Sequence, residues 1–413
     1  MMAETVPLRR VSKIVSGQSP PNDTVTDLVD GLPFVQGNAE FGPVSPNPKF
    51  QCMTAPKQCH VGDILLSVRA PVGAMNLADR EYGIGRGLAA VRLSAPGDQR
   101  FLSYCISASM PTLLSLATGS TFESVTRDHV GAHRIPWLEA ADQRRIADFL
   151  DDQVTRIDAI AEASKVQISL LDERVAEAIL SAVRGDDLPD QGTGSGLRWL
   201  GNVPKSWPVL TVGSQFEVLL GKMLDEKRNA GTHSVPYLRN TNVQWDRVDE
   251  DDLKEMDIAP AERHRFLVRQ GDLLICEGGQ PGRAAIWAGR CEEIYYQKAL
   301  HRARTRGRSL PRWLFYCLRA AVGMNAFAGE NGQTTIGHLT SEQLRGQRLP
   351  FPTPDVQTKI VAALDAYQDE AKHLVAVLNA RIKFLQERKR ALITAAVTGE
   401  FDVSSTASGR NVA

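Results

Sequence analysis

The strongest constraint on the fold of this chain is an internal repeat, in which one pattern of residues returns 214 positions later. Arg134-Ile135-Pro136-Trp137 returns as Arg348-Leu349-Pro350-Phe351, and Gln143 returns as Gln357 without a gap. Four further pairs share this offset: Arg145-Ile146 with Lys359-Ile360, Leu150-Asp151 with Leu364-Asp365, Glu173-Arg174 with Glu387-Arg388, and Ala182-Val183 with Ala396-Val397. Self-similarity at a fixed offset is typical of a duplicated architecture, so two similar units are predicted.

The repeat continues upstream of Arg134, more weakly and with a drifting offset. Residues 101–105 (FLSYC) match residues 313–317 (WLFYC) at an offset of 212, and residues 61–65 match residues 270–274 at an offset of 209. The drift indicates short insertions in the second copy. Each copy is therefore predicted to be a divergent globular head followed by a better preserved segment.

The preserved segments share a 4,3 spacing that is typical of coiled-coil helices. Its positions in the first segment are Leu150, Val154, Ile157, Ala161, Ser164, Ile168, Leu171, Val175, Ala178 and Ala182. In the second they are Leu364, Gln368, Ala371, Val375, Leu378, Ile382, Leu385, Lys389, Leu392 and Ala396. Proline precedes and glycine follows each segment, so each helix should run ~40 residues, or ~60 Å. Two amphipathic helices packed on separate cores are the alternative, but their matching length and phase favour mutual pairing.

The predicted fold class is α/β (α+β), with small mixed sheets in two tandem heads joined by two long helices. The second head connects the end of the first helix to the start of the second, and an antiparallel coiled coil would keep those ends close. Short apolar runs alternate with turn signals in both heads, as expected for small sheets that are either mixed or antiparallel. The predicted segments are a first head (1–140), a first helix (141–186), a linker and lead-in (187–206), a second head (207–353), a second helix (354–402) and a disordered tail (403–413).

Composition excludes several classes of protein. The 413 residues carry 48 Lys and Arg against 48 Asp and Glu, so bulk charge would not hold the chain on nucleic acid or an anionic membrane. No apolar run has the length of a signal sequence or a membrane span, so a cytoplasmic protein is expected.

The six cysteines form no C-x-x-C pair and are expected to be reduced core thiols. Cys52 and Cys59-His60 lack the spacing of zinc modules, so no metal site is predicted.

The sequence lacks the common catalytic motifs by which it could act as an enzyme alone. It has no G-x-x-x-x-G-K-[ST] phosphate loop, no G-x-S-x-G and no H-E-x-x-H. It also lacks the Asp/Asn-Pro-Pro-aromatic motif of amino-methyltransferases, and residues 83–87 (GIGRG) lack the strand-turn-helix context of a nucleotide loop. No catalytic residue is predicted, and the chain is not expected to be an enzyme by itself.

Positive charge is local, in the stretch from Lys298 to Arg319, which carries seven basic side chains and no acidic one. Strand-like alternation would place Arg302, Arg304 and Arg306 on one face, where their guanidinium groups would suit phosphates. A solvated basic edge without a ligand is the alternative interpretation.

Polar residues in the turns of both heads are of types that pair with bases or phosphates. In the second head the candidates are Arg239, Asn240, Asn242, Gln280, Arg283, Lys298, Gln333, Thr334 and Thr335. In the first head they are Gln36, Asn38, Arg69, Arg86, Ser120 and Thr121. Each one alone is an ordinary turn residue, but their recurrence at matching places in two heads favours a nucleic-acid interface.

The chain resembles the specificity subunit of type I restriction–modification enzymes over nearly its whole length. The resemblance rests on the order head, helix, head, helix and on residues 200–209 (LGNVPKSWPV) before the second head. Three repeated motifs also fit. Each helix start carries Arg-Ile-Pro or Arg-Leu-Pro followed by Gln-x-[RK]-Ile, each head carries Gly-Asp-[IL]-Leu, and each helix end carries Val-x-Gly-[DE]. The first head lacks the Gly-x-[IV]-Pro-x-x-Trp lead-in, so a short N-terminus or a slightly truncated head is expected.

The resemblance implies that each head is a target-recognition domain reading one half of a bipartite, asymmetric DNA site. The helices would set the distance between the two half-sites, at most ~18 base pairs. They would also dock two methyltransferase subunits, and motor-nuclease restriction subunits would join that core. Adenine N6-methylation and ATP-driven cleavage would belong to those partners, together with S-adenosylmethionine, ATP and magnesium, leaving no cofactor in this chain. The residues expected to pair the helices or dock partners are Leu150, Ile157, Ile168, Leu171, Val175, Leu364, Val375, Leu378, Ile382, Leu385 and Leu392.

A coiled-coil scaffold with two protein-binding heads and no DNA role is the alternative from another class. Charge reversal at Arg302, Arg304 and Arg306 should distinguish the two, because it would weaken a DNA reader on all sequences and leave a scaffold's partners bound.

Overall fold

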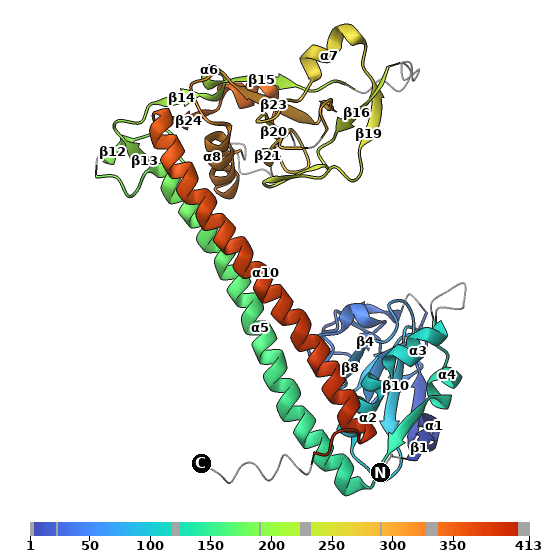
Figure 1. The fold of residues 1–413 in the computed structure, drawn as a ribbon. Helices are drawn as coiled ribbons and strands as arrows, with labels where there is room; N and C mark the ends of the chain where they lie inside the picture. Colours follow the sequence, from blue (N-terminus) through green and yellow to red (C-terminus); the bar gives the residue numbers. More distant parts are fainter. Residues whose placement is uncertain are drawn as a thin grey trace. The chain divides into compact units, whose positions relative to one another are not determined.

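The computed structural model describes residues 4–21, 24–117, 124–189, 191–223, 233–289, 291–327 and 338–403. The chain divides into two compact units (Figure 1). The first unit comprises residues 1–164 and 379–413, and the second comprises residues 165–378. Each of the two long helices therefore contributes one half to each unit.

The first unit contains a four-stranded antiparallel sheet in the order β2-β10-β7-β8. Its central strand β7 is buried on both faces: Ile64 and Leu66 pack with helix α2, and Leu65 packs toward the second sheet of the unit. This explains why the strand is a continuous apolar run rather than an alternating one. The strands are β2 (Ser12–Ser16), β7 (Ile64–Ser67), β8 (Met75–Leu77) and β10 (Leu88–Leu93).

The second sheet of the first unit has five strands in the order β3-β5-β4-β9-β6. It is mixed, because β4 and β9 run parallel while the other pairs are antiparallel. The strands are β3 (Thr26–Asp27), β4 (Pro33–Val35), β5 (Phe50–Gln51), β6 (Gln58–Cys59) and β9 (Tyr82–Ile84), and the short 3-10 helix η2 (Asn38–Glu40) follows β4.

The second unit repeats this arrangement. A four-stranded antiparallel sheet has the order β15-β23-β20-β21, and a three-stranded mixed sheet, β19-β16-β22, contains the parallel pair β16 and β22. The prediction of small mixed sheets is therefore confirmed in both heads. The strands are β15 (Phe216–Leu220), β16 (Ser234–Leu238), β19 (Lys254–Asp257), β20 (Leu273–Cys276), β21 (Ala284–Ile286), β22 (Tyr295–Tyr296) and β23 (Leu300–Thr305).

In each unit a strand pair joins the start of the head to the segment before its long helix. In the first unit β1 (Glu4–Pro7) pairs with β11 (Arg134–Trp137), and in the second β14 (Val209–Thr211) pairs with β24 (Arg348–Pro350). The shorter helices are α1 (Leu8–Val11), α2 (Gln99–Ala108), α3 (Met110–Ala117) and α4 (Arg127–Ala132) in the first unit, and α6 (Val212–Gln215), α7 (Pro260–Phe266), α8 (Pro311–Gly323) and α9 (Ser341–Gly346) in the second.

The predicted linker is partly β-structure. Within it β12 (Gln191–Gly194) pairs antiparallel with β13 (Asn202–Pro204). Positive φ angles at Gly196 (75°) and Gly201 (76°) allow the chain to reverse between these strands. Trp207, which follows β13, is buried and meets Trp313 edge to face with 5.8 Å between ring centroids. This aromatic contact fixes the start of the second head.

The long helices α5 (Ala140–Arg184) and α10 (Pro354–Thr398) match the predicted bounds within a few residues. All twenty positions of the predicted 4,3 spacing are buried or half-buried, including the polar Gln368 and Lys389. In the first unit Leu150 and Ala396 belong to one hydrophobic cluster, and in the second Val183 and Leu364 share another. The two helices therefore run antiparallel, as the connectivity predicted (Figure 1).

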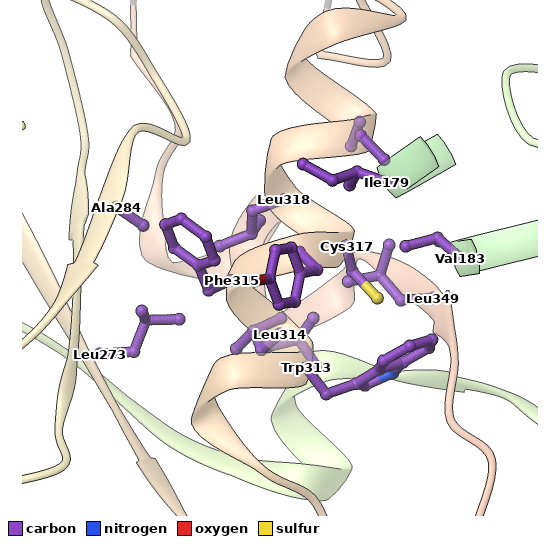
Figure 2. Packing of buried hydrophobic residues seen from close by; sticks show 14 of the residues in the cluster. Ile179, Val183, Leu273, Ala284, Trp313, Leu314, Phe315, Cys317, Leu318 and Leu349 are labelled. Atoms are coloured by element: carbon purple, nitrogen blue, oxygen red, sulfur yellow. The ribbon is translucent and has the colours of Figure 1, made fainter. Parts of the chain in front are cut away.

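Helix α8 lies at the centre of the second unit's core. Its six consecutive residues 313–318 are fully buried, packed between the sheet and the end of α5. Figure 2 shows Trp313, Phe315 and Leu318 among Leu273 and Ala284 of the sheet and Val183 of α5. A helix that is apolar on all sides is expected where it is enclosed in this way.

None of the helices in the described ranges is both long enough and apolar enough to cross a membrane. Five of the six cysteine side chains are buried, and that of Cys291 is half-buried.

Candidate nucleic-acid interface

Two parallel strands of the second unit end at the same edge of its three-stranded sheet. Leu238 of β16 pairs with Tyr296 of β22, so Arg239 follows one strand and Gln297 and Lys298 follow the other at neighbouring strand ends. A third loop joins them: Lys222 N donates to Tyr296 O (3.0 Å) and Lys298 N donates to Lys222 O (2.9 Å). We call Lys222, Arg239 and Lys298 the second-unit corner. Ligands of α/β proteins commonly bind at the carboxyl ends of strands, which is where this corner lies.

The first unit builds the same corner from equivalent strands. Val35 of β4 pairs in parallel with Ile84 of β9, and Gln36 and Arg86 follow these strands. The third loop is again attached through its backbone, because Gln18 N donates to Ile84 O (3.0 Å). We call Gln18, Gln36 and Arg86 the first-unit corner.

Both corners depend on a glycine where the third loop meets the parallel pair. A Cβ atom on Gly17 would lie 2.1 Å from Gly85 O, and one on Gly221 would lie 2.2 Å from Gln297 O. Sequence reasoning missed the two residues that follow these glycines, Gln18 and Lys222. The available signal was a glycine followed by a polar residue, immediately after residues 12–16 (SKIVS) and residues 216–220 (FEVLL).

A cavity of about 860 Å³ lies beside the first-unit corner. Gln36 and Arg86 line it together with Phe34, Phe50 and Glu40. The ring of Phe50 is partly exposed, and Gln36 and Arg86 are exposed as well. An amide, a guanidinium group and an aromatic face are the groups that pair with and stack on nucleic-acid bases.

The two corners differ in charge. The first carries one cation, Arg86, whereas all three members of the second are basic. Two of these are already paired: Lys222 Nζ lies 2.7 Å from Glu262 Oε2, and Arg239 lies 2.6 Å from Asp252 Oδ2. Hydrogen bonds from Arg239 and Lys254 lower the pKa of Asp252. A phosphate approaching this corner would compete with an exposed carboxylate rather than with a buried one.

A second polar group lies where the turn between β20 and β21 meets the turn after β16. Arg283 Nη2 donates to Asn240 O (2.9 Å), and its Nη1 lies 3.4 Å from Gln280 Oε1. The Nε atoms of Arg239 and Arg283 are buried and have no hydrogen-bond partner among the described residues. The structure thus brings together four of the predicted candidates, Arg239, Asn240, Gln280 and Arg283, from separate parts of the sequence.

Asn242 does not join this group as a candidate, because its side chain is only 3% exposed. Its Oδ1 accepts from Arg239 N (2.9 Å), and its Nδ2 donates to Asp249 O (3.0 Å). The prediction that Asn242 reads a base is contradicted, since these bonds use its amide to shape the turn that carries Arg239 and Asn240.

The prediction that Arg302, Arg304 and Arg306 present one open face to phosphates is also wrong. Arg302 is 1% exposed, and its guanidinium group donates to Glu217 Oε2 (3.0 Å) and to Leu267 O (2.9 Å). Arg304 does share the face of Arg302, but this face is covered by the segment between α7 and β20. Arg306 lies beyond the end of strand β23 at Thr305, and it is the one of these three arginines that is exposed.

The internal repeat explains the position of Arg304. It forms a bidentate pair with Asp272 (2.6 and 2.7 Å), and Arg92 forms the equivalent pair with Asp63 (2.7 and 2.8 Å). In both units the pair joins one central strand of the four-stranded sheet, β10 or β23, to the residue just before the other, β7 or β20. Arg304 is therefore a structural residue, and Arg92 is its equivalent in the first head.

Lys298 of the second-unit corner is exposed. The remaining candidates are dispersed: Arg69 is exposed, and Asn38 is half-buried within η2. Five others, Ser120, Thr121, Gln333, Thr334 and Thr335, lie outside the described residues. Across the described ranges no group of three or more His, Cys, Asp or Glu side chains is placed to hold a metal ion.

Comparison with known proteins connects this doubled architecture to one family. The model of the type I restriction modification DNA specificity domain matches residues 4–170 and again residues 204–383, which is well over half of the chain. Each match covers one head and the part of a long helix that follows it.

Two curated relatives match part of the chain. One is assigned as the type I restriction enzyme MjaX specificity subunit of Methanocaldococcus jannaschii, 35% identical over 173 residues, 41% of this chain and 40% of the relative. The other is the type I restriction enzyme EcoKI specificity subunit of Escherichia coli, 23% identical over 299 residues, 69% of this chain and 61% of the relative. The matches thus span less than two thirds of either relative's length.

Solved structures share the fold. A chain from work on the complex assembly and conformational transition of the type I R-M system superposes with a TM-score of 0.75 at 17% identity, covering 97% of this chain and 98% of its own length. The HsdS subunit from Thermoanaerobacter tengcongensis superposes with a TM-score of 0.53 at 17% identity, covering 96% and 97%. Together with the two family matches, these findings show that the chain belongs to the family of type I restriction modification DNA specificity domains.

Proposed function

We propose that this chain is the non-catalytic DNA sequence-specificity subunit of a type I restriction–modification complex. Each head would read one half of a bipartite, asymmetric DNA site. The observation that carries the proposal is the doubled family match, one copy on each head. It is supported by the two corners, which place polar or basic residues at the same strand ends in both units.

Differences between the corners support reading of different half-sites. The first-unit corner offers an amide and one guanidinium group beside a partly exposed aromatic ring, whereas the second-unit corner offers three cations. Base choice depends on such side-chain differences, while cations hold the phosphate backbone of any sequence. The second unit would therefore supply more of the sequence-independent affinity.

Exposed apolar side chains on the long helices support docking of partner subunits. They lie outside the seam between α5 and α10, at positions where a lone helix pair would carry polar residues. In the second unit they are Val166, Leu170, Leu374 and Val377, and in the first they are Ile160 and Phe384. The proposed occupants are two methyltransferase subunits, with restriction subunits joining them. S-adenosylmethionine, ATP and magnesium would be bound by those partners.

The test is a map of adenine N6-methylation across the native genome, with and without the gene for this chain. Loss of one motif that consists of two short halves and an unspecific gap would establish the specificity role and reveal the target. An unchanged methylation map would refute the proposal in its native setting and favour a coiled-coil scaffold with protein-binding heads, which the exposed apolar side chains of the helices would also suit.

Exposed cations of the second unit should carry part of the DNA affinity. We expect Lys298→Gln and Arg306→Gln each to weaken binding of the reconstituted complex on all DNA sequences and to reduce the slope of log K against log salt by about 1. Neither side chain is buried, so folding should be unaffected. Titrations at several salt concentrations, with cognate and unrelated duplexes, measure both effects.

Lys205→Gln is the matched control, because Lys205 is also an exposed lysine of the second unit but follows β13 rather than the corner strands. Its salt slope should equal that of the unmodified chain. Equal slopes for all three variants would contradict a phosphate role for Lys298 and Arg306.

A further inference from the structure

A network of ion pairs around Arg312 joins three separate segments of the second unit. Arg312 belongs to α8, and its Nε donates to Asp365 Oδ1 on α10 (2.7 Å). Its Nη atoms donate to the carboxylate of Asp246, which lies between β17 (Val243–Gln244) and β18 (Arg247–Val248). Lys372 of α10 also reaches Asp246, with Nζ 2.9 Å from Oδ2. We call these four residues the Arg312 network.

The Arg312–Asp246 pair at the centre of the Arg312 network is largely withdrawn from water, whereas Asp365 and Lys372 on α10 are 39% and 58% exposed. The side chains of Arg312 and Asp246 are 19% and 17% exposed, and the guanidinium group lies 4.5 Å from the centroid of the Phe315 ring. Burial raises the pKa of Asp246, but hydrogen bonds from Arg312 and Lys372 outweigh it, so the pKa is lowered. The carboxylate therefore stays charged at neutral pH, and screening by salt is weaker than at the surface.

The first unit contains only part of this arrangement. Arg100 and Tyr104 of α2 both donate to Asp151 of α5 (2.7 Å each), as Arg312 and Tyr316 of α8 donate to Asp365 of α10. The other carboxylate partners of Arg100 are Asp98, at the N-cap of its own helix, and Asp148, on α5. Among the described residues, only the second unit extends the network to a hairpin.

That hairpin begins at the turn that carries candidate DNA-reading residues. Asn242 closes this turn by accepting from Arg239 N and donating to Asp249 O, so both ends of the hairpin are attached to it. Asp246 itself has φ 60°, a left-handed conformation that is unusual for a residue other than glycine. Its N donates to Ala284 O (3.2 Å), which holds the hairpin against β21.

We propose that Asp246 and Arg312 are positioning residues for DNA reading by the second unit. Through them the β17–β18 hairpin, and with it the Arg239–Asn240 turn, is tied to helix α10. The inference rests on the proposed function and deepens it, because it names what holds the reading turn in place. An arginine is needed at this point because its planar fork reaches two carboxylates on different segments, which a lysine ammonium group cannot do with the same geometry.

The test uses the full chain in its native complex and measures methylation at genomic sites that differ from the motif at one base. With Asp246→Asn we expect methylation of sites mismatched in one half to rise about tenfold relative to perfect sites, with the other half unchanged. Arg312→Lys should relax the same half. Arg100→Lys, the counterpart in the first unit, should not raise methylation of sites that are mismatched in this same half.

Asp251→Asn is the matched control, since Asp251 is an exposed acid just beyond the same hairpin and takes no part in the Arg312 network. It should leave the motif unchanged. Asp246→Asn combined with Arg312→Lys should be no worse than the more severe single change, because both cut one link. Thermal melting of each purified complex separates this effect from unfolding, which would lower methylation of both halves equally.

Relaxation of both halves to the same extent, or a motif unchanged by both substitutions, would overturn the positioning role while leaving the proposed function intact. An unmodified chain that directs no bipartite methylation would overturn the proposed function and this inference with it.

Discussion

Replacing Arg302 by Gln is expected to lower the free energy of unfolding of the second unit by about 2–5 kcal/mol. The guanidinium group is buried on β23 and donates to Arg265 O (3.1 Å) and Leu267 O (2.9 Å) as well as to Glu217. It also lies 5.9 Å from the centroid of the Tyr296 ring. The shorter glutamine side chain would leave a cavity and would free buried carbonyl groups.

Urea titration followed by circular dichroism would measure this loss. Arg306→Gln is the control, because Arg306 lies just beyond the same strand but is exposed, and its effect on stability should stay within about 0.5 kcal/mol. Glu217→Gln should cost less than Arg302→Gln, because the Glu217 side chain is 46% exposed and a glutamine amide oxygen can still accept from Arg302. An Arg302→Gln chain as stable as the unmodified one, but with weaker DNA binding, would restore the original phosphate hypothesis.

Replacing Gln357 by Leu is expected to destabilise the second unit by about 2–5 kcal/mol. The side chain is 0% exposed, and its Oε1 accepts from Leu310 N (2.8 Å) at the N-cap of α8. Its Nε2 donates to Pro352 O (2.8 Å) and lies 3.3 Å from Ser309 Oγ. Leucine has nearly the same volume but leaves these groups buried without a partner, so the cost comes from lost hydrogen bonds rather than from a cavity.

The first unit offers an internal replicate of this experiment. Gln143 Oε1 accepts from Asp98 N (3.0 Å) and its Nε2 donates to Leu138 O (2.8 Å), so Gln143→Leu should destabilise the first unit in the same way. Gln386→Leu, at an exposed position of α10, is the control and should change stability little. Hydrogen exchange at α2 and α8 would assign each loss to its unit. A tolerated Gln357→Leu would mean that the glutamine is not needed to hold the head on its helix.

The long helices could be predicted almost completely from sequence. Their seam depends on spacing along the chain, and neighbours three and four residues apart share a helix face whatever the rest of the protein does. Every predicted seam position is buried or half-buried, including Ser164, Gln368 and Lys389, which hydrophobicity alone would have excluded. The exact offset of the repeat also identified Gln143 and Gln357 as equivalent.

The candidate interface could be predicted only in part. Gln36, Arg86, Arg239 and Lys298 were recognised as turn residues, but Gln18 and Lys222 were not, because their position depends on which strands run parallel. Arg302 was misassigned because alternation tells which side chains share a strand face and not what covers that face. Asn242 was misassigned because a turn-forming amide and a base-reading amide have the same sequence signal.

The sequence by itself determined the duplication and the antiparallel helix pair, because these follow from periodicity and from the order of segments along the chain. Only the tertiary structure decided which polar groups are buried and which are offered to a ligand. Arg312 illustrates the reason: its carboxylate partners, Asp246 and Asp365, lie 66 and 53 residues away along the chain. Contacts over such separations arise from the packing of whole segments, so they cannot be predicted from a local pattern in the sequence.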